Sequence, residues 1–345
     1  MSFSHRILVV RNDKLGDFML AWPALKALRH ASPDNHIAVL VPDYTAPMAR
    51  LCPWIDEVII DPGAGSGSQL TTLMRNGHFD ALLTLFSTPR VGWAGMRARI
   101  PLRMAPATKW AQLFYGTRIP QRRSRSLKPE YIYNLELAEA LAERLNQYPR
   151  RVSPPYWPLS DEERTAQRQQ LAQELSLDSQ RQWWVLHPGS GGSAVNLTPQ
   201  RYIELAEKVA RQTDKAISFI VSWGPGEEER ATAVVEALTT HGVDARLMPA
   251  RAGLAEFALT LAAANGMIAG STGPLHIAGC LNIATLGFYP AKRSATSLRW
   301  QTCNSSDKRL AFSPPPSENA GQATNMELVD IDAAASALAE LINKG

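Results

Sequence analysis

Two successive series of alternating strand-like and helix-like runs constrain the fold of this 345-residue chain more than any other feature. In the first series, the sequence predicts strands at 5–11, 36–41, 57–60 and 80–85. It predicts helices at 17–30, 44–51 and 130–146, and one more that ends at about residue 76. In the second, it predicts strands at 182–187, 216–222, 244–248, 266–270 and 283–288 and helices at 161–175, 199–212, 226–239, 254–264 and 331–343. This alternation is typical of βαβ units that build parallel sheets.

A segment rich in proline and polar residues, 147–161 ("QYPRRVSPPYWPLSD"), separates the two series. The chain is long enough for two domains of ordinary size, and its 45% hydrophobic and 20% charged residues are those of a globular protein. We therefore expect an α/β protein with two Rossmann-like parallel-sheet domains, 1–155 and 156–330, facing a central cleft.

The sequence also indicates a compartment. No apolar run approaches the roughly 18 residues of a membrane span, and the N-terminus "MSFSHRILVV" leads into a strand without a signal-peptide pattern. The three cysteines Cys52, Cys280 and Cys303 are odd in number and lack the spacing of metal ligands. These features together predict a cytoplasmic protein.

Two glycine- and serine-rich turns follow strands of the second half. "LHPGSGGSAVNLTP" (186–199) and "GSTGPLHIAG" (270–279) each run from a strand end into a helix. Backbone N–H groups at such a turn, with the N-terminus of the helix behind them, suit a phosphate. Ser271 and Thr272 could either cap the second helix or donate to a phosphate. The pair of turns predicts a site for a diphosphate nucleotide, although neither turn has Walker or GxGxxG spacing.

The stretch "WGPGEEER" (223–230) places three glutamates at the start of a helix. Favourable interaction with the helix dipole explains two of them. The third could accept a hydrogen bond from a ribose hydroxyl.

Residues 81–129 contain ten basic side chains and no acid. Trp93, Trp110, Phe114 and Tyr115 are interleaved with them. This composition indicates an anionic partner, and it leaves nucleic acid, an anionic membrane surface and a phosphorylated sugar as alternatives to a simply solvated face.

The turn "RNDKLGDFML" (11–20) carries Asp13 and Asp17 directly after the first strand. In α/β proteins, ligands bind at the carboxyl ends of the strands. With a nucleotide on the second half, a carboxylate here could take a proton from an acceptor, and Asp17 at the helix start would be kept ionised by the helix N-terminus. A plain N-cap is the alternative reading of Asp17.

Taken together, these segments resemble the family 9 glycosyltransferases, the ADP-heptose:lipopolysaccharide heptosyltransferases. The likeness rests on "ILVVRNDKLGDFMLAWPALKALR", "ARIPLRMAP", "HPGSGG", "WGPGEEER" and "STGPLHIAG", in that order along the chain. The resemblance implies a GT-B fold, a terminal helix 331–345 that packs back on the N-terminal domain, and inverting heptosyl transfer from ADP-heptose to the anionic inner core of lipopolysaccharide. It also implies peripheral contact with the inner face of the inner membrane, no nucleic-acid partner, no metal and no cofactor.

The resemblance also assigns roles to residues of this sequence. It implies that Asp17 is the catalytic base, because the family's aspartate directly follows a glycine. The expected donor-binding residues are Ser190, Gly191, Asn196, Glu227, Ser271, Thr272, Gly273, His276 and Lys292. The expected acceptor-binding residues are the basic side chains Arg99, Arg103, Lys109, Arg122, Arg123 and Arg125.

Two positions depart from the family pattern. Asn196 stands where the family has a phosphate-binding lysine, and Ser271 replaces an aspartate expected to contact the donor sugar. Lys292 or Arg293, after strand 283–288, could supply the missing cation. A family 9 transferase with another nucleotide sugar, a non-catalytic glycan-binding protein on the same fold, and an NAD-dependent oxidoreductase are the alternatives. The missing GxGxxG weighs against the last.

Overall fold

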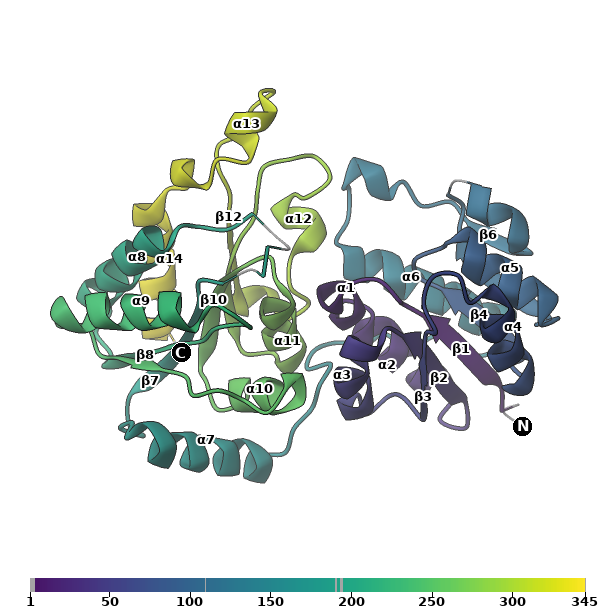
Figure 1. Cartoon of the computed structure of the whole chain (residues 1–345), viewed down its shortest axis with the longest axis horizontal. Helices are drawn as coiled ribbons and strands as arrows, with labels where there is room; N and C mark the ends of the chain where they lie inside the picture. The colour runs from purple at the N-terminus through teal and green to yellow at the C-terminus, as the bar shows by residue number, and fades with distance from the viewer. Residues whose placement is uncertain (1–3, 109, 190, 193–194, 345) are drawn as a thin grey trace. The chain divides into compact units, whose positions relative to one another are not determined.

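The structure is a computed structural model that describes residues 4–108, 110–189, 191–192 and 195–344. The chain forms two compact units (Figure 1). Unit 1 contains Met1–Arg123 and Lys128–Trp157, and unit 2 contains Ser124–Leu127 and Pro158–Gly345. The change from unit 1 to unit 2 after Trp157 falls within the proline-rich segment 147–161.

Unit 1 is built on a sheet of six parallel strands in the order β3-β2-β1-β4-β5-β6. The strands are β1 (Arg6–Val10), β2 (His36–Val41), β3 (Glu57–Ile60), β4 (Ala81–Thr84), β5 (Leu102–Pro106) and β6 (Thr117–Ile119). The helices are α1 (Leu15–Met19), α2 (Trp22–Ala31), α3 (Ala46–Leu51), α4 (Gly67–Asn76), α5 (Pro89–Arg97) and α6 (Glu130–Arg144), with short 3₁₀ helices η1 (Asp43–Thr45), η2 (Trp110–Phe114) and η3 (Arg123–Arg125).

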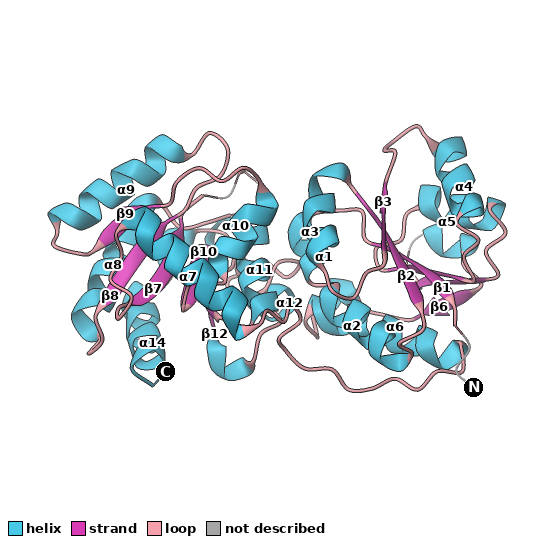
Figure 2. Cartoon of the chain, turned by 90° about the horizontal axis from the view of Figure 1, so that it is seen from below, coloured by secondary structure: helices cyan, strands magenta, loops and turns pink. Residues whose placement is uncertain are grey.

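Helices cover both faces of this sheet, as expected for parallel strands (Figure 2). The helices α4 and α5 lie over one face, where Leu70 and Val91 pack on Leu8 and Leu82 of the sheet. The helices α2 and α6 pack together over the other face. Burial on both sides explains why the strands are almost continuously apolar.

Unit 2 repeats the design, with the strand order β12-β11-β10-β7-β8-β9 and every neighbouring pair parallel. The strands are β7 (Gln182–His187), β8 (Ile217–Val221), β9 (Ala245–Leu247), β10 (Gly266–Gly270), β11 (Ala284–Phe288) and β12 (Arg309–Phe312). The helices are α7 (Asp161–Leu175), α8 (Pro199–Gln212), α9 (Glu228–Thr240), α10 (Leu254–Leu261), α11 (Gly273–Leu281), α12 (Ser297–Trp300), α13 (Ala320–Ala323) and α14 (Ile331–Lys344), with 3₁₀ helices η4 (Ser306–Lys308) and η5 (Met326–Leu328).

The last helix differs from its expected position. We expected it to pack back on the N-terminal domain, but α14 lies against α8 in unit 2. Its buried side chains Ile331, Leu338 and Ile342 join the hydrophobic core of that unit. Its amphipathic apolar face therefore completes the cover of the second sheet.

Each sheet has one topological switch point, where the strand order reverses. In unit 1 it lies between β1 and β4, and in unit 2 between β7 and β10. Ligands of open α/β sheets bind beyond the carboxyl ends of the strands at such points. The turn at 11–20 follows β1, and the two glycine- and serine-rich turns follow β7 and β10, so all three lie at switch points.

Strands β5, β6 and β12 and helices α5, α12 and α13 lie where the sequence did not predict a regular element. Strands β5 and β6 and helix α5 lie in the basic segment 81–129, and β12 lies in a stretch expected to be irregular. The missed strands are three to five residues long and contain arginines, which masks any strand pattern. Their pairing partners in the sheet, rather than their own residue types, determine their conformation.

Candidate functional site

A buried arginine organises the turn after β1. Arg11 is the first residue beyond that strand, and only 2% of its side chain is exposed. Its guanidinium donates to the Oδ1 atoms of Asp13 at 2.8 Å and of Asp17 at 2.5 Å. It also reaches Glu130 Oε1 at 3.2 Å, at the start of α6. One cation thus holds three carboxylates together at the switch point of unit 1.

The structure excludes the N-cap reading of Asp17. Helix α1 begins at Leu15, its N-cap residue is Lys14, and no side chain caps it. Asp17 therefore lies inside the first turn, with its Oδ1 atom on Arg11. Among the described residues, no hydrogen-bond donor to its Oδ2 atom is found. That second oxygen is the one available to accept a proton.

Burial and mutual repulsion set the electrostatics of this cluster. Burial disfavours the charged form of Arg11, but Asp13, Asp17 and Glu130 outweigh it and raise the pKa of the guanidinium. Burial raises the pKa of Asp13 to about 6, and the charge of Asp17 adds to the rise, although Arg11 opposes it. Asp13 is thus the carboxylate of the cluster that resists ionisation.

Asp13→Asn tests this electrostatic balance. The pKa of Asp13 is about 6 in the folded chain and ordinarily 3.8, so the folded state holds this proton more tightly than the unfolded state. The protonated Asp13 therefore contributes about 3 kcal/mol to the free energy of unfolding at pH values below its ordinary pKa. This contribution is lost as the pH rises through about 6. We expect the wild type to lose stability relative to Asp13→Asn between about pH 4 and pH 8 in urea denaturation. If the difference in free energy of unfolding between the wild type and Asp13→Asn does not change with pH, the pKa of Asp13 is not raised.

A second polar cluster lies beside the first. Asp61, which follows β3, accepts hydrogen bonds from the Asn12 side chain, the Arg90 guanidinium and the Gly63 N–H. These contacts lower the pKa of Asp61, although burial opposes them. The Arg90 Nη1 atom is buried and has no hydrogen-bond partner among the described residues. Arg90 lies in the first turn of α5 and therefore places a guanidinium at the same edge of the sheet as Asp17.

The basic segment 81–129 has acids as neighbours in space, although it has none in sequence. Arg123 binds Glu130 at 2.7 Å and also donates to the Leu85 carbonyl. Arg103 donates to the carbonyls of Ile100 and Phe114. Both guanidiniums therefore hold unit 1 together, and we no longer expect them to bind an acceptor.

The other expected acceptor residues differ in position. Arg99 is exposed and follows α5, which returns the chain to the amino ends of the strands, away from the edge that carries Asp17. Arg122 and Arg125 are exposed. Lys109 lies outside the described residues.

In unit 2, Glu227 ties two loops together. Its carboxylate accepts hydrogen bonds from the N–H groups of Gly191 and Gly224, both at 3.0 Å. A Cβ atom at Gly189 would lie 1.9 Å from Glu227 Oε2, so a larger residue there would displace the Glu227 carboxylate from these contacts. Glu228 and Glu229 are exposed in the first turn of α9, as the helix-dipole explanation requires.

Asn196 is a structural residue of the loop after β7. Its amide donates to the carbonyls of Pro188 at 3.0 Å and Gly189 at 3.2 Å. Its Oδ1 atom accepts from the Leu197 N–H and from the Tyr202 hydroxyl. These four contacts use both amide hydrogens and the oxygen, so we no longer expect this side chain to bind a phosphate.

Two buried polar atoms at the second glycine- and serine-rich turn have no partner. Thr272 is the N-cap residue of α11, but its side chain makes no capping bond. Its Oγ1 atom and the Nδ1 atom of His276 are both buried without a hydrogen-bond partner among the described residues. Burial lowers the pKa of His276 to about 4, so its ring is neutral near pH 7. Unsatisfied polar atoms are costly, and a bound ligand would satisfy them.

The remaining expected donor residues lie on the same edge of the second sheet. Gly191 is exposed with a positive φ of 53°, and Gly273 begins α11. The Ser271 N–H donates to the Phe288 carbonyl at the end of β11. Lys292 is exposed on the loop that follows that strand. Ser190 lies outside the described residues.

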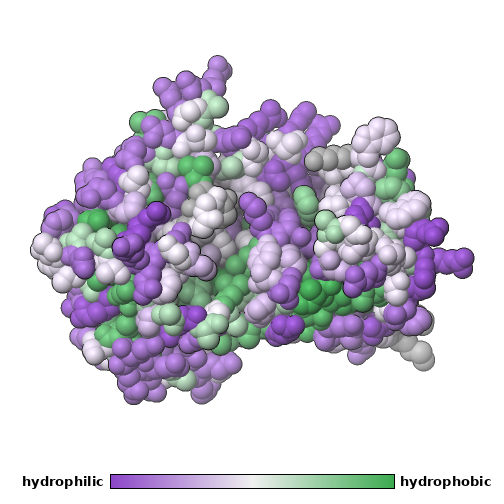
Figure 3. All heavy atoms as spheres, in the orientation of Figure 1, coloured by the Kyte–Doolittle hydropathy of each residue, from purple (hydrophilic) through white to green (hydrophobic). Residues whose placement is uncertain are grey.

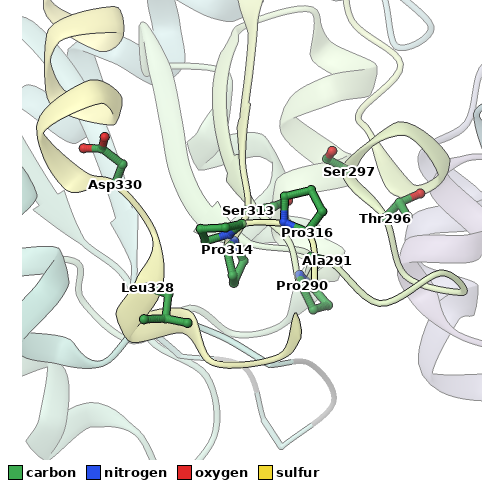
Figure 4. A pocket seen from close by; sticks show the side chains of 10 residues that line it. Pro290, Ala291, Thr296, Ser297, Ser313, Pro314, Pro316, Leu328 and Asp330 are labelled. Atoms are coloured by element: carbon green, nitrogen blue, oxygen red, sulfur yellow. The ribbon is translucent and has the colours of Figure 1, made fainter. Parts of the chain in front are cut away.

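A separate pocket of unit 2 lies beyond the carboxyl ends of β11 and β12 (Figure 4). Its walls are Pro290, Ala291, Thr296, Ser297, Ser313, Pro314, Pro315, Pro316, Leu328 and Asp330. Asp330 is the one charged side chain in this lining, and its negative charge disfavours a phosphate. The pocket is therefore a poorer diphosphate site than the turns after β7 and β10.

The described residues contain no group of three histidine, cysteine or acidic side chains placed to hold a metal ion. A search of the same residues finds no helix with the length and apolarity that a membrane crossing requires.

Sequence reasoning overlooked Arg11, Glu130, Asp61 and Arg90 as members of the site. An arginine directly after a buried strand, followed by two aspartates, was the available signal for Arg11. Glu130 carried no such signal, since it lies 119 residues from Arg11 in sequence.

Comparison with known proteins identifies the family. The model of glycosyltransferase family 9 (heptosyltransferase) matches residues 69–318. A putative glycosyltransferase of Haemophilus influenzae is 39% identical over 339 residues, which cover 97% of this chain and 95% of that protein. The chain therefore belongs to glycosyltransferase family 9 and is a glycosyltransferase.

Solved structures agree on the fold. The Escherichia coli ADP-heptose lipopolysaccharide heptosyltransferase II has a TM-score of 0.74 and 18% identity, with 98% of this chain and 99% of that chain covered. The Escherichia coli heptosyltransferase WaaC with ADP has a TM-score of 0.72 and 17% identity, with 97% and 99% covered. The expected GT-B fold, with two Rossmann-like parallel-sheet units, is confirmed.

Proposed function

We propose that this glycosyltransferase moves a heptose from ADP-L-glycero-D-manno-heptose to the inner core of lipopolysaccharide, with inversion at the anomeric carbon. The observation that supports this mechanism is the pattern of hydrogen bonds to the two carboxylate oxygens of Asp17. Arg11 fixes its Oδ1 atom at 2.5 Å, and no donor among the described residues engages its Oδ2 atom. A carboxylate held in one orientation with a free oxygen is suited to act as a general base.

The proposed reaction is a single displacement. Asp17 takes the proton of an acceptor hydroxyl while that oxygen attacks the anomeric carbon of the donor. The bond between the anomeric carbon and the diphosphate oxygen breaks, and its electron pair leaves with ADP. A general base contributes about 10²–10⁴-fold to such a step.

We propose that unit 2 binds the donor at the turns after β7 and β10. Thr272 Oγ1 and His276 Nδ1, with the N-terminus of α11, would meet the diphosphate. Glu227, which already fixes the glycine-rich loop, would accept a hydrogen bond from a ribose hydroxyl. Because the Asn196 side chain already uses its hydrogen-bonding groups, the cation for the departing diphosphate would come from Lys292 on the loop after β11.

Lys292→Ala tests this cation. We expect the variant to bind ADP more weakly than the wild type by isothermal calorimetry. If the affinity is unchanged, Lys292 does not bind the diphosphate, and the N-terminus of α11 binds it without this cation.

Thr272→Val tests the donor site without disturbing the fold. The hydroxyl has no partner in the described protein, so its removal should leave thermal stability unchanged. Loss of its bond to a phosphate should weaken ADP binding by about 1–3 kcal/mol, measured by isothermal calorimetry.

Thr285→Val is the matched control for this experiment. The Thr285 hydroxyl is buried and bonded to Thr302 at 3.0 Å and to Asn304 at 3.1 Å. This variant should therefore lose stability and keep its ADP affinity. Native ADP affinity in Thr272→Val would rule out the proposed diphosphate contact.

The acceptor would bind to unit 1 beside Asp17. Arg90 is the guanidinium placed at that edge, and the exposed Arg122 of unit 1 remains a candidate, whereas Arg125 belongs to unit 2. These side chains suit the carboxylates and phosphates of a lipopolysaccharide core. We propose no metal at this site, because Arg11 already pairs with the carboxylates that a divalent ion would need.

Another nucleotide sugar is the alternative donor. Ser271 lacks the carboxylate that the family resemblance leads us to expect at the donor sugar. A thermal-shift panel separates the possibilities, because ADP stabilisation supports the main proposal, and UDP or GDP stabilisation supports the alternative.

A further inference from the structure

Two exposed aromatic side chains of unit 1 flank the turn that carries the proposed base. Tyr44, in η1 after β2, is 56% exposed, and Phe86, two residues after the end of β4, is 47% exposed. Strands β2 and β4 are the two neighbours of β1 in the sheet, and Asp17 follows β1. We call Tyr44 and Phe86 the aromatic pair. Both rings therefore lie at the carboxyl edge of the strands, one on each side of the turn of Asp17.

A hydrogen bond ties Tyr44 to that turn. Its hydroxyl donates to the Asp13 carbonyl at 2.6 Å. Burial raises the pKa of this hydroxyl, and the nearby charges of Asp13 and Asp17 add to the rise. The next residues, Thr45 and Ala46, are fully buried, so η1 is anchored in the unit. Figure 3 shows hydrophobic atoms gathered around the positions of β2 and α3, the two elements that η1 connects.

The residue before Phe86 is fixed by its backbone contacts. Leu85 is fully buried, and its N–H donates to the Val10 carbonyl at 3.0 Å. The Leu85 carbonyl accepts from the Arg123 guanidinium, also at 3.0 Å. Arg123 in turn binds Glu130, a member of the carboxylate cluster at the switch point. The backbone that leads to Phe86 is thus held by the same cluster that orients the proposed base.

The groups at this edge of the sheet are those of a carbohydrate site. Asp17 has a carboxylate oxygen without a donor among the described residues, and Arg90 has a buried guanidinium nitrogen without a partner among them. Ligand sites combine a few such polar groups with apolar and aromatic walls. The face of an aromatic ring carries partial negative charge, so it packs well against the weakly positive C–H groups on one side of a sugar ring.

The spacing of the strands suits a single sugar. Neighbouring strands lie about 4.8 Å apart, so β2 and β4 are separated by about 10 Å with β1 between them. One sugar residue with its exocyclic groups bridges such a span. A sugar placed across the turn after β1 would therefore meet both rings of the aromatic pair and the proposed base.

We propose that the aromatic pair stacks on the C–H face of the acceptor sugar and thereby positions its reacting hydroxyl beside the Oδ2 atom of Asp17. This inference rests on the proposed transfer reaction and names the feature of the acceptor that the site recognises. That feature is a sugar ring with an exposed C–H face, in addition to the anionic substituents that a guanidinium would bind. Tyr44 and Phe86 are thus positioning residues for the acceptor.

Steady-state kinetics with a defined inner-core oligosaccharide test the proposal. Tyr44→Ser and Phe86→Ser should each lower kcat/KM for the acceptor by about 3–10-fold, and the double variant should lose more than either. The donor KM should not change. Because stacking does not depend on charge, the loss should be the same at low and high salt. A double variant with the wild-type kcat/KM for the acceptor overturns the proposal.

Tyr44→Phe separates stacking from a structural role of the hydroxyl. Phenylalanine keeps the ring and removes the hydrogen bond to the Asp13 carbonyl. We expect kcat/KM for the acceptor to stay close to the wild-type value. If Tyr44→Phe is as impaired as Tyr44→Ser, the hydroxyl merely holds the turn, and the stacking role of Tyr44 is wrong.

Tyr148→Ser is the matched control. Tyr148 is 86% exposed in unit 1 and follows Gln147, whose amide contacts Asn35 and His5 next to the amino ends of β2 and β1. The control thus removes an exposed aromatic ring at the opposite edge of the same sheet, and it should leave every kinetic constant unchanged. Thermal unfolding checks that each variant is folded.

Failure of the aromatic pair and failure of the proposed function are separate outcomes. If the wild type transfers to a different sugar acceptor, the same substitutions must lower kcat/KM for that acceptor, because the rings recognise a sugar face rather than one particular sugar. Saturation-transfer NMR applies even without turnover, and the C–H protons of the bound oligosaccharide should receive less saturation from the double variant. Equal saturation from the wild type and the double variant, or weaker ADP binding by the double variant, overturns the proposal.

Discussion

Asp17→Asn should lower kcat by about 10²–10⁴-fold while ADP affinity stays at the wild-type value. The substitution keeps the shape of the side chain and removes its ability to accept a proton. Arg11 can still donate to the amide oxygen, so the turn after β1 should keep its conformation. The proposed donor site lies in unit 2, among other residues, and should be unaffected. Steady-state kinetics and calorimetry on the same preparation separate the two quantities.

Asp13→Asn is the matched control for that variant. It removes the other carboxylate of the same turn, which also binds Arg11. Its effect on kcat should be much smaller, because with Asp17 as the base Asp13 serves only as a second partner of Arg11. If Asp13→Asn proves the less active variant, the base is Asp13 and the proposed role of Asp17 is wrong.

Arg11→Met should destabilise the protein by about 3–5 kcal/mol, the cost of leaving buried charges without their partner. Methionine fills much of the same space but leaves Asp13, Asp17 and Glu130 to repel one another. The difference in free energy of unfolding between Arg11→Met and the wild type should become smaller as pH falls from about 8 to 5, because the carboxylates then take up protons in the folded state. Urea denaturation at both pH values measures this change.

Arg211→Met provides the control at an exposed position. Arg211 is 68% exposed and lies 3.7 Å from Glu207, so its removal should change stability very little. If Arg11→Met is as stable as this control, the Arg11 cluster does not hold the turn in place.

The strand-end position of the candidate site's turns could be predicted from sequence, but the contacts within the site could not. Strands β1, β7 and β10 are apolar runs followed by distinctive turns, so the turns were recognised and their strand-end position was confirmed. The contacts of Arg11 depend on Glu130, which only the folded sheet brings close. Sequence spacing holds no information on a pair separated by 119 residues.

Asn196 and Arg103 show the same limit in another way. Each lies in a motif that resembles a ligand-binding segment, but the N–H groups of each side chain donate to backbone carbonyls of the protein. Asn196 closes the loop after β7, and Arg103 binds the Ile100 and Phe114 carbonyls. A polar side chain in a motif has a ligand role only if its hydrogen-bonding capacity is left over after folding. Thr272 and His276 meet that condition among the described residues.

Product analysis decides whether this protein transfers heptose with inversion. Purified protein is incubated with ADP-L-glycero-D-manno-heptose and a defined lipopolysaccharide inner-core acceptor, and the product is examined by mass spectrometry and NMR. Our account predicts one heptose added per acceptor, release of one ADP for each transfer, and an anomeric configuration opposite to that of the donor. Retention of configuration, or no transfer from ADP-heptose by protein that turns over another nucleotide sugar, would contradict it.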